Sequence, residues 1–204
     1  STNGMTIGFK AVNGSGSGGS YGGLGGGVLA NPLYGTAANP NEVGSGGGGF
    51  DASPAGNGGG LVRIAAQTFV LQGAVRANGG VAEGFSAGGS GGGIRIDAGT
   101  LSGTGTISAS GSSGTPSGGG GGGGGRVAVY YADAADFNLS NITVNGGTGS
   151  GAPNGQNGSI HLQQQMAVGP PGKENHRPDR AKHPRPASLE RCGPEIARSD
   201  LARS

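Results

Sequence analysis

Apolar and polar residues alternate in four short segments of the chain, and each segment directly follows a glycine. A period of two indicates a β-strand with one buried face. The first apolar positions of these segments are 32, 33 and 33 residues apart, so the sequence predicts four equivalent strands in consecutive repeats. These positions, each with its apolar partner two residues later, are Val62 and Ile64, Ile94 and Ile96, Val127 and Val129, and Ile160 and Leu162.

A second, shorter strand is predicted in three of the repeats, at 75–79, 107–111 and 142–146. Each ends in an Asn-Gly or Ser-Gly pair, where we expect a turn, because glycine accepts and asparagine tolerates a positive φ. A further copy at 12–14 lies about two periods before the first of these strands. The sequence between them is degenerate: residues 31–40 carry two Asn-Pro pairs in place of a strand, and we expect a loop or an edge insertion there.

Glycine tracts separate the predicted strands, and the longest is the eight-residue run 118–125. Two interpretations stay open. The tracts are flexible linkers, since glycine loses the most conformational entropy on ordering. Alternatively they pass close to neighbouring backbone, as loops or as polyproline-II-like strands, where any Cβ would clash. Their recurrence in phase with the strands favours a structural role.

The energetics of a single repeat predict a stacked architecture. Ordering each residue costs about 1–2 kcal/mol. One repeat offers only about four to six medium-sized apolar side chains, which stabilise by about 1.5–3 kcal/mol each when buried. A repeat therefore needs its neighbours, as in a solenoid. We expect an all-β fold, a parallel β-solenoid or β-helix with Gly-rich loops; the alternative is a Gly-rich β-sandwich.

The composition excludes several classes of protein. Glycine supplies 52 of the 204 residues, charged residues make up 12%, aromatic residues 4%, and Trp is absent, which argues against an ordinary enzyme core. Collagen is excluded because glycine does not recur at every third position. No apolar stretch approaches the 18 or more residues of a membrane span.

The chain divides into two different kinds of polypeptide. Residues 1–167 have five basic and six acidic side chains, a net charge of −1, and contain all nine aromatic residues. Residues 168–204 have eight basic and five acidic side chains, a net charge of +3, with six of the 11 prolines and the single cysteine, Cys192. We expect a Gly-rich β repeat domain at 1–167 and a disordered Pro/Arg-rich tail at 168–204. Whether the tail is native or an out-of-frame terminus stays open.

Several Gly-rich strings occur in a characteristic order, at 18–26, 31–35, 44–49, 91–109 and 125–131. In this order the chain resembles the glycine-rich repeat modules of very large secreted or surface-attached proteins of bacteria and some protists. The resemblance covers roughly 8–165. It implies an extracellular, repetitive, non-catalytic module with an adhesive or surface-layer role, and it supplies no functional residues.

Two enzymatic alternatives compete with that role. The residues around Ser86 match the Gly-x-Ser-x-Gly elbow, with Asp133 and His161 following in hydrolase order, but a loop is predicted before the serine where the elbow needs a strand. A polysaccharide-cleaving β-helix needs clustered carboxylates. Asp97 aligns with uncharged residues in the other repeats, and Asp133 and Asp136 are assigned to turn chemistry.

Ligand-binding motifs are also weak. No Gly-rich window has the context of a nucleotide site, no tract has the Asp of a repeat-in-toxin calcium site, and one Cys with three scattered His gives no zinc spacing. Thr104 and Thr106 lack the repetition of an ice-binding face, so we expect them at a strand edge. Tyr130 and Tyr131 could stack on sugar rings, although Tyr131 is in phase with the core positions.

The sequence therefore predicts a non-catalytic structural or adhesive repeat module of a larger protein, extracellular or at the cell surface. No catalytic, cofactor-binding or metal-binding residues and no cofactors are expected. The expected partners are surface glycans or other copies of the module, with no nucleic acid and no membrane span. A carbohydrate-active β-helix enzyme, of the polysaccharide lyase or hydrolase kind, and a glycan-binding module are the alternatives.

Overall fold

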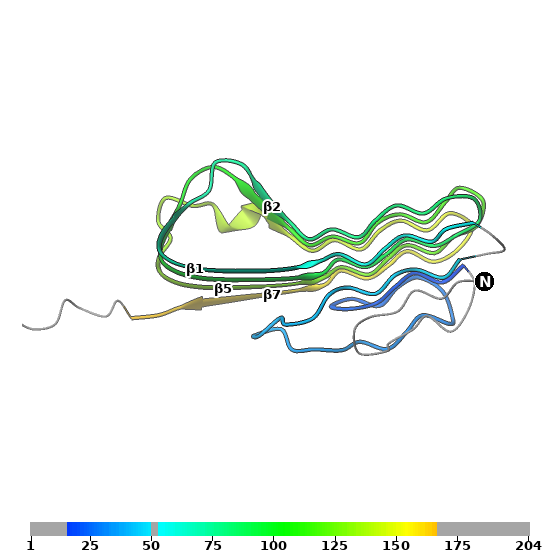
Figure 1. The fold of residues 1–204 in the computed structure, drawn as a ribbon, viewed down its shortest axis with the longest axis horizontal. Coiled ribbons are helices and arrows are strands. Elements are labelled where there is room, and N and C mark those ends of the chain that lie inside the picture. Colours follow the sequence, from blue (N-terminus) through cyan, green and yellow to red (C-terminus); the bar gives the residue numbers. More distant parts are fainter. Residues whose placement is uncertain (1–15, 50–52, 167–204) are drawn as a thin grey trace, which may run out of the picture. The chain divides into compact units, whose positions relative to one another are not determined.

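The computed structural model describes residues 16–49 and 53–166 (Figure 1). Every described residue belongs to one compact unit, Ser1–Val168. The strand copy expected at 12–14 and the tail expected at 168–204 lie outside the described residues.

The predicted main strands form one parallel sheet. It contains β1 (Leu61–Val70), β3 (Gly93–Ser102), β5 (Arg126–Asp133) and β7 (Ser159–Gln164), in the order β1-β3-β5-β7. The register confirms the predicted period, since Val62 pairs with Ile94, Ile94 with Val127, and Val127 with Ile160.

The second strands form a separate parallel sheet. It contains β2 (Ala74–Arg76), β4 (Thr106–Ser108) and β6 (Ile142–Thr143), and the short 3-10 helix η1 (Leu139–Asn141) leads into β6. Each of the first three coils contributes one strand to each sheet, and β7 adds a fourth strand to the main sheet, so the solenoid prediction is confirmed (Figure 1). The β-sandwich alternative is wrong, because hairpin-connected strands would pair antiparallel and the strand pairs here are parallel.

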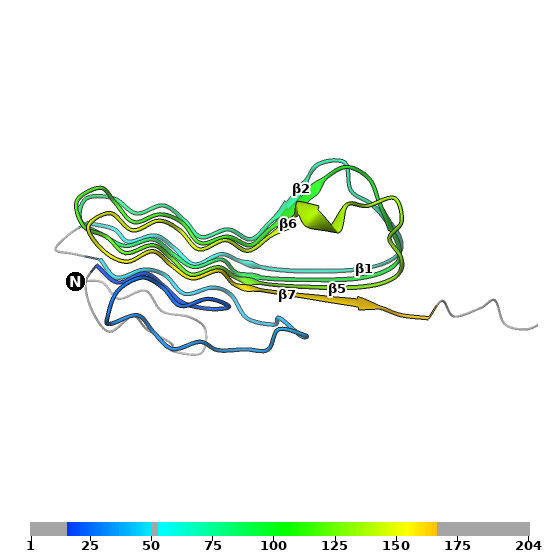
Figure 2. The same cartoon turned by 180° about the vertical axis from the view of Figure 1, so that it is seen from behind.

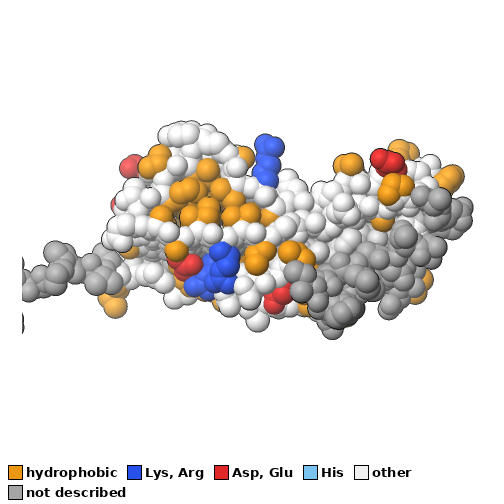
Figure 3. Space-filling model, in the orientation of Figure 1, with side chains coloured by type: hydrophobic (Ala, Val, Ile, Leu, Met, Phe, Trp, Pro, Cys, Tyr) orange, Lys and Arg blue, Asp and Glu red, His pale blue; other side chains and the backbone are white. Residues whose placement is uncertain are grey.

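The apolar core lies between the two sheets, at one end of the elongated coil (Figure 2). Ile96, Val129 and Ile107 are fully buried there. In the first coil the equivalent side chains are only half-buried, because no described strand pairs with the outer edge of β1. Figure 3 shows apolar side chains gathered at the same end of the elongated coil. The half-buried apolar residues of the first coil are Val62, Ile64, Phe69 and Val75.

The glycine tracts form the rest of each coil, where they are ordered and largely buried. The contacts of the tract 118–125 repeat every three residues, which is the repeat of a polyproline II helix. A Cβ on Gly119 or Gly122 would collide with the carbonyls of Ser86 and Gly89 in the neighbouring coil. On the other two faces, Gly120 and Gly123 approach Gly26 and Gly23, and Gly121 and Gly124 approach Gly147 and Val144.

The amide groups of the same tract point between these contacts, toward three further segments. Gly123 donates to the carbonyl of Gly19 (2.8 Å) and Gly124 to that of Gln156 (2.8 Å). Gly125 donates to the carbonyl of Ala109 (2.7 Å). The tract is thus surrounded on all sides by backbone, and the flexible-linker interpretation is wrong, because close packing and hydrogen bonds offset the entropy of ordering glycine.

The turns expected at the Asn-Gly and Ser-Gly pairs do not form. Gly79, Gly111 and Gly146 are not among the glycines with positive φ. The chain instead runs on into a glycine tract, and these residues are glycine because a Cβ would collide with the carbonyls of Gly89, Gly122 and Gly155 in the returning tract. Positive φ values occur where the tracts reverse, at Gly84 (60°), Gly118 (118°) and Gly151 (70°).

The loop predicted at 31–40 is confirmed, since no strand occurs there. Buried Asn31 fixes its start: its amide oxygen accepts a hydrogen bond from the Ser20 amide (2.9 Å), and its Nδ2 donates to the Ser20 carbonyl (3.1 Å). Arg126 holds it at Tyr34, where Nε donates to the carbonyl oxygen (3.1 Å). The loop therefore belongs to the folded body.

Candidate functional site

The outer face of the main sheet carries the polar side chains of the strands in rows that cross the coils. One row contains Arg63, Arg95, Ala128 and His161, and the next contains Ala65, Asp97, Tyr130 and Gln163. These rows arise because alternate residues of stacked parallel strands share one face.

Arg95 and Asp97 form a bidentate ion pair on this face, with both N–O distances 2.8 Å. The hydrogen bonds from Arg95 lower the pKa of the Asp97 carboxyl below its ordinary value. The Arg95 guanidinium also lies 4.6 Å from the centroid of the Tyr130 ring, and the His161 ring lies 5.5 Å from it. The ring of Tyr130 is therefore already in contact with two side chains of the protein.

The loop that includes 31–40 is tied to the same face. The Tyr130 hydroxyl donates to the carbonyl of Ala38 (2.7 Å), Arg95 donates to the Asn39 amide oxygen (2.8 Å), and Arg63 donates to that of Asn41 (2.7 Å). The two arginines thus hold the loop in place, and their guanidinium groups are engaged within the protein.

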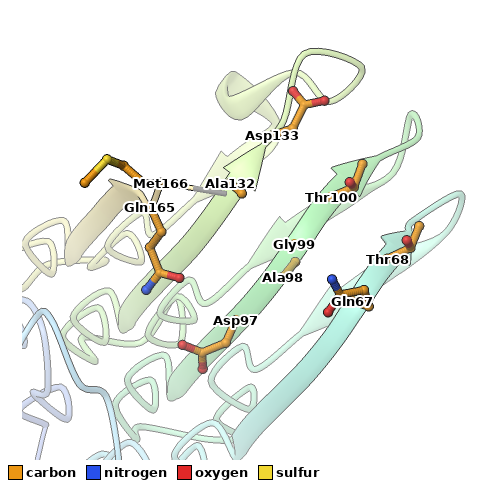
Figure 4. Close-up of a pocket in the computed structure, with 10 residues that line it drawn as sticks. All are labelled: Gln67, Thr68, Asp97, Ala98, Gly99, Thr100, Ala132, Asp133, Gln165 and Met166. Carbon is orange, nitrogen blue, oxygen red and sulfur yellow. The ribbon is translucent and has the colours of Figure 1, made fainter. Parts of the chain in front are cut away.

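Beside this cluster the sheet carries a trough with a volume of about 470 Å³ (Figure 4). Gly99 and Ala132 lie at its centre, Asp97 lies at one end, and Asp133 lies at the other. The remaining residues that line the trough are Gln67, Thr68, Ala98, Thr100, Gln165 and Met166.

A shared break in strand alternation creates the trough. In β1, Gln67 and Thr68 are both exposed between inward-facing Ala66 and Phe69. In β3, Gly99 and Thr100 occupy the same places, and the register skips the Gln67–Gly99 pair. Such bulge-like irregularities bend strands and redirect side chains. Here two consecutive residues per strand face outward. The small residues among them, Gly99 and Ala132, lie on the two central strands of the sheet.

The two carboxylates of the trough are not arranged as an acid and base pair. Asp133 pairs with Thr100, which places it three residues, or roughly 10 Å, along the strand from Asp97. Asp133 accepts a hydrogen bond from the Ala135 amide (3.0 Å), which is the turn role that the sequence predicted. A general acid needs a raised pKa, whereas Arg95 lowers the pKa of Asp97.

The hydrolase-like residues do not come together. Ser86 is fully buried, and its Oγ donates to the carbonyl of Ser53 (2.9 Å). Ser86 lies where the tracts reverse, whereas Asp133 ends β5, so the two are roughly 40 Å apart along the coil at about 3.1 Å per tract residue and 3.3 Å per strand residue.

The other sequence candidates have structural roles. Tyr131 packs against the core, as its phase predicted. Thr106 begins β4 at an exposed position, and Thr104 donates to the Gln72 side chain (3.0 Å). Asp136 accepts a hydrogen bond from Gly103 through its backbone carbonyl (3.1 Å).

Neither a metal cluster nor a membrane span is found in the part of the chain that the structure describes. No three His, Cys, Asp or Glu side chains gather in a way that could hold a metal ion among residues 16–49 and 53–166. No helix within these ranges is long and apolar enough to cross a bilayer.

The sequence analysis did not predict the trough. A signal was present: the paired polar residues Gln67 and Thr68 interrupt the alternation of an otherwise regular strand, and Gly99 and Thr100 do the same one period later. Searches for similar proteins give no further guide, because no protein-family model, curated protein or solved structure matches this chain.

Proposed function

We propose that the chain is a non-catalytic structural or adhesive repeat module of a larger protein, located outside the cell or on its surface. The observation that carries this proposal is the use of the repeats. Each of the first three coils adds one strand to both sheets and two segments to the close-packed group of glycine tracts, which we call the glycine bundle. In the described residues the repeats thus serve the packing of the stack.

The edges of the stack support membership of a larger assembly. Among the described residues, no strand pairs with the outer edge of β1 or of β7. On β7 the inward-facing Ile160 and Leu162 are 42% and 41% exposed. Solenoids require their terminal coils to be covered. Further repeats, or other copies of the module, would supply that cover.

The extracellular assignment rests on the resemblance to secreted repeat modules. Antibody labelling of intact source cells tests the location. Staining only after permeabilisation would contradict it.

An assay on polysaccharides tests the absence of catalysis. We expect the full chain to release no new reducing ends and no unsaturated products from neutral or acidic polysaccharides. Turnover that is abolished in the Asp97→Ala or Asp133→Ala variant, but kept in the Asp136→Ala variant, would identify a carbohydrate-active β-helix enzyme and overturn the proposal.

A further inference from the structure

The trough on the outer face of the main sheet presents polar side chains that the protein itself does not use. Gln67 comes from β1, Thr100 from β3, and Gln165 directly follows β7 (Figure 4). Among the described residues, these side chains make no hydrogen bond to another group of the protein, whereas the neighbouring Arg95 and Asp97 satisfy each other.

We propose that this trough binds a short, uncharged oligosaccharide. Amides and hydroxyls each donate and accept hydrogen bonds, as the hydroxyl groups of a sugar require. The free oxygen of the Asp133 carboxylate adds an acceptor at one end, because only Oδ1 is engaged, with the Ala135 amide. The volume of about 470 Å³ lies within the range of small-ligand sites.

The shape of the trough fits a linear ligand. Gly99 and Ala132 leave its centre low, while the longer side chains Gln67 and Gln165 rise from the strands on either side. Asp97 and Asp133 mark its two ends, separated by roughly 10 Å along the strands. A chain of sugar rings laid parallel to the strands would meet the two glutamines laterally and Asp133 at one end.

Charge excludes an acidic ligand. Asp97 is neutralised by Arg95, which leaves Asp133 as the unpaired charge of the trough. Arg63 and Arg95 lie on the adjoining rows, but both hold the loop at Asn39 and Asn41. A uronic or sialic acid would therefore face a like charge without a free cation to offset it.

Aromatic stacking contributes little to this binding. The ring of Tyr130 contacts Arg95 and His161, and Tyr131 packs against the core. The sugar-stacking role considered for the two tyrosines is thus replaced by hydrogen bonding from the trough. The affinity of one site is then modest, and repetition of the module raises the overall avidity through multivalency.

The inference rests on the adhesive form of the proposed function, and a glycan array probed with the full chain tests it. We expect binding to neutral oligosaccharides and none to uronic or sialylated ones. Isothermal titration with the best neutral oligosaccharide of the array should then show at least about a tenfold loss of affinity in the double variant Gln67→Ala, Gln165→Ala. The Gln72→Ala variant, which removes an exposed glutamine outside the trough, should bind as the wild type does.

The outcomes separate this inference from the proposed function. Three results would overturn the trough as the site: binding of acidic glycans only, wild-type affinity in the double variant Gln67→Ala, Gln165→Ala, or no binding to any glycan. None of these results would show catalysis or an intracellular location, so the structural role would stand. Cleavage of the bound oligosaccharide would overturn the proposed function while leaving the binding site intact.

Circular dichroism of the double variant checks that the fold is retained. The Ala132→Gln variant, which fills the centre of the trough, gives a second test with the same expected loss of affinity.

Discussion

Individual glycines are required in this protein mainly for close packing. Gly89, Gly122 and Gly155 occupy equivalent places in successive coils, and a Cβ on each would collide with the carbonyl of the residue one coil earlier. Asn57 holds the same place in the first coil, where it is exposed. A side chain is tolerated there because no described segment packs beyond it, so the choice of residue follows the position of the coil in the stack.

Alanine substitution at two glycines tests this packing. We expect Gly122→Ala to reduce the free energy of unfolding by at least about 1–3 kcal/mol, because the methyl group would force apart two backbones. Gly60→Ala is the matched control: a Cβ there meets nothing within 4 Å. It should be neutral or stabilise by up to about 1 kcal/mol through the unfolded state. Urea unfolding monitored by circular dichroism measures the free energy of unfolding of both variants. Equal effects of the two substitutions would contradict the close packing of the glycine tracts.

At the scale of elements, two tyrosines connect the loop to the glycine bundle. The hydroxyl of buried Tyr21 donates to Glu42 (3.0 Å), and that of Tyr34 donates to the Val43 carbonyl (2.7 Å). Their rings lie 4.8 Å apart, and the Arg126 guanidinium lies 5.4 Å from the Tyr21 ring. Burial raises the pKa of both phenols well above the ordinary value, and hydrogen bonding to Glu42 raises that of Tyr21 further. The neutral phenol is therefore the form that the fold accepts.

Alkaline pH should destabilise the protein through these two side chains. Because the pKa of each phenol is raised in the folded state, its contribution is complete below the unfolded value of about 10 and is lost as the pH rises above it. We expect the free energy of unfolding to fall by up to about 1.4 kcal/mol per pH unit for each tyrosine. In Tyr21→Phe the decline should be about half as steep, from a baseline lowered by roughly 1 kcal/mol. Denaturant midpoints measured across this pH range decide it, and an unchanged slope in the variant would exclude Tyr21 as a cause.

The whole molecule combines two kinds of packing along one stack of coils. One end of each coil buries apolar side chains between two parallel sheets, and the other buries backbone against backbone. The central tract 118–125 hydrogen-bonds to the coil that follows it, through Gly121 to Pro153 and Gly124 to Gln156. Cooperativity should therefore extend through both regions and across all the coils.

Truncation tests that cooperativity. A chain that ends at residue 167 should melt within about 2 °C of the full chain, since the tail from 168 is expected to add no packed core. A chain that ends at residue 152 loses β7 and the tract that accepts hydrogen bonds from the central one. We expect it to melt far lower, in a broader transition. Differential scanning calorimetry compares the two, and identical melting of the shorter chain would show that the coils unfold independently.

The sequence alone determined the strands and their register. Val62, Ile94, Val127 and Ile160 recur at the period of the coil, and this local alternation of side chains specifies which face is buried. Stacking of such rungs followed from energetics, because one repeat cannot offset its own entropy. The loop at 31–40 was readable from its Asn-Pro pairs for a similar local reason.

Only the tertiary structure decided the conformation of the glycine tracts and the position of the trough. Glycine has no side chain, so a tract such as 118–125 contains no pattern that could say which face meets which neighbour. Its partners, among them Gly19 and Gly23, are about 100 residues away in the sequence. The trough likewise depends on Gln67, Gly99, Ala132 and Gln165, which the stacking of four coils brings onto one face.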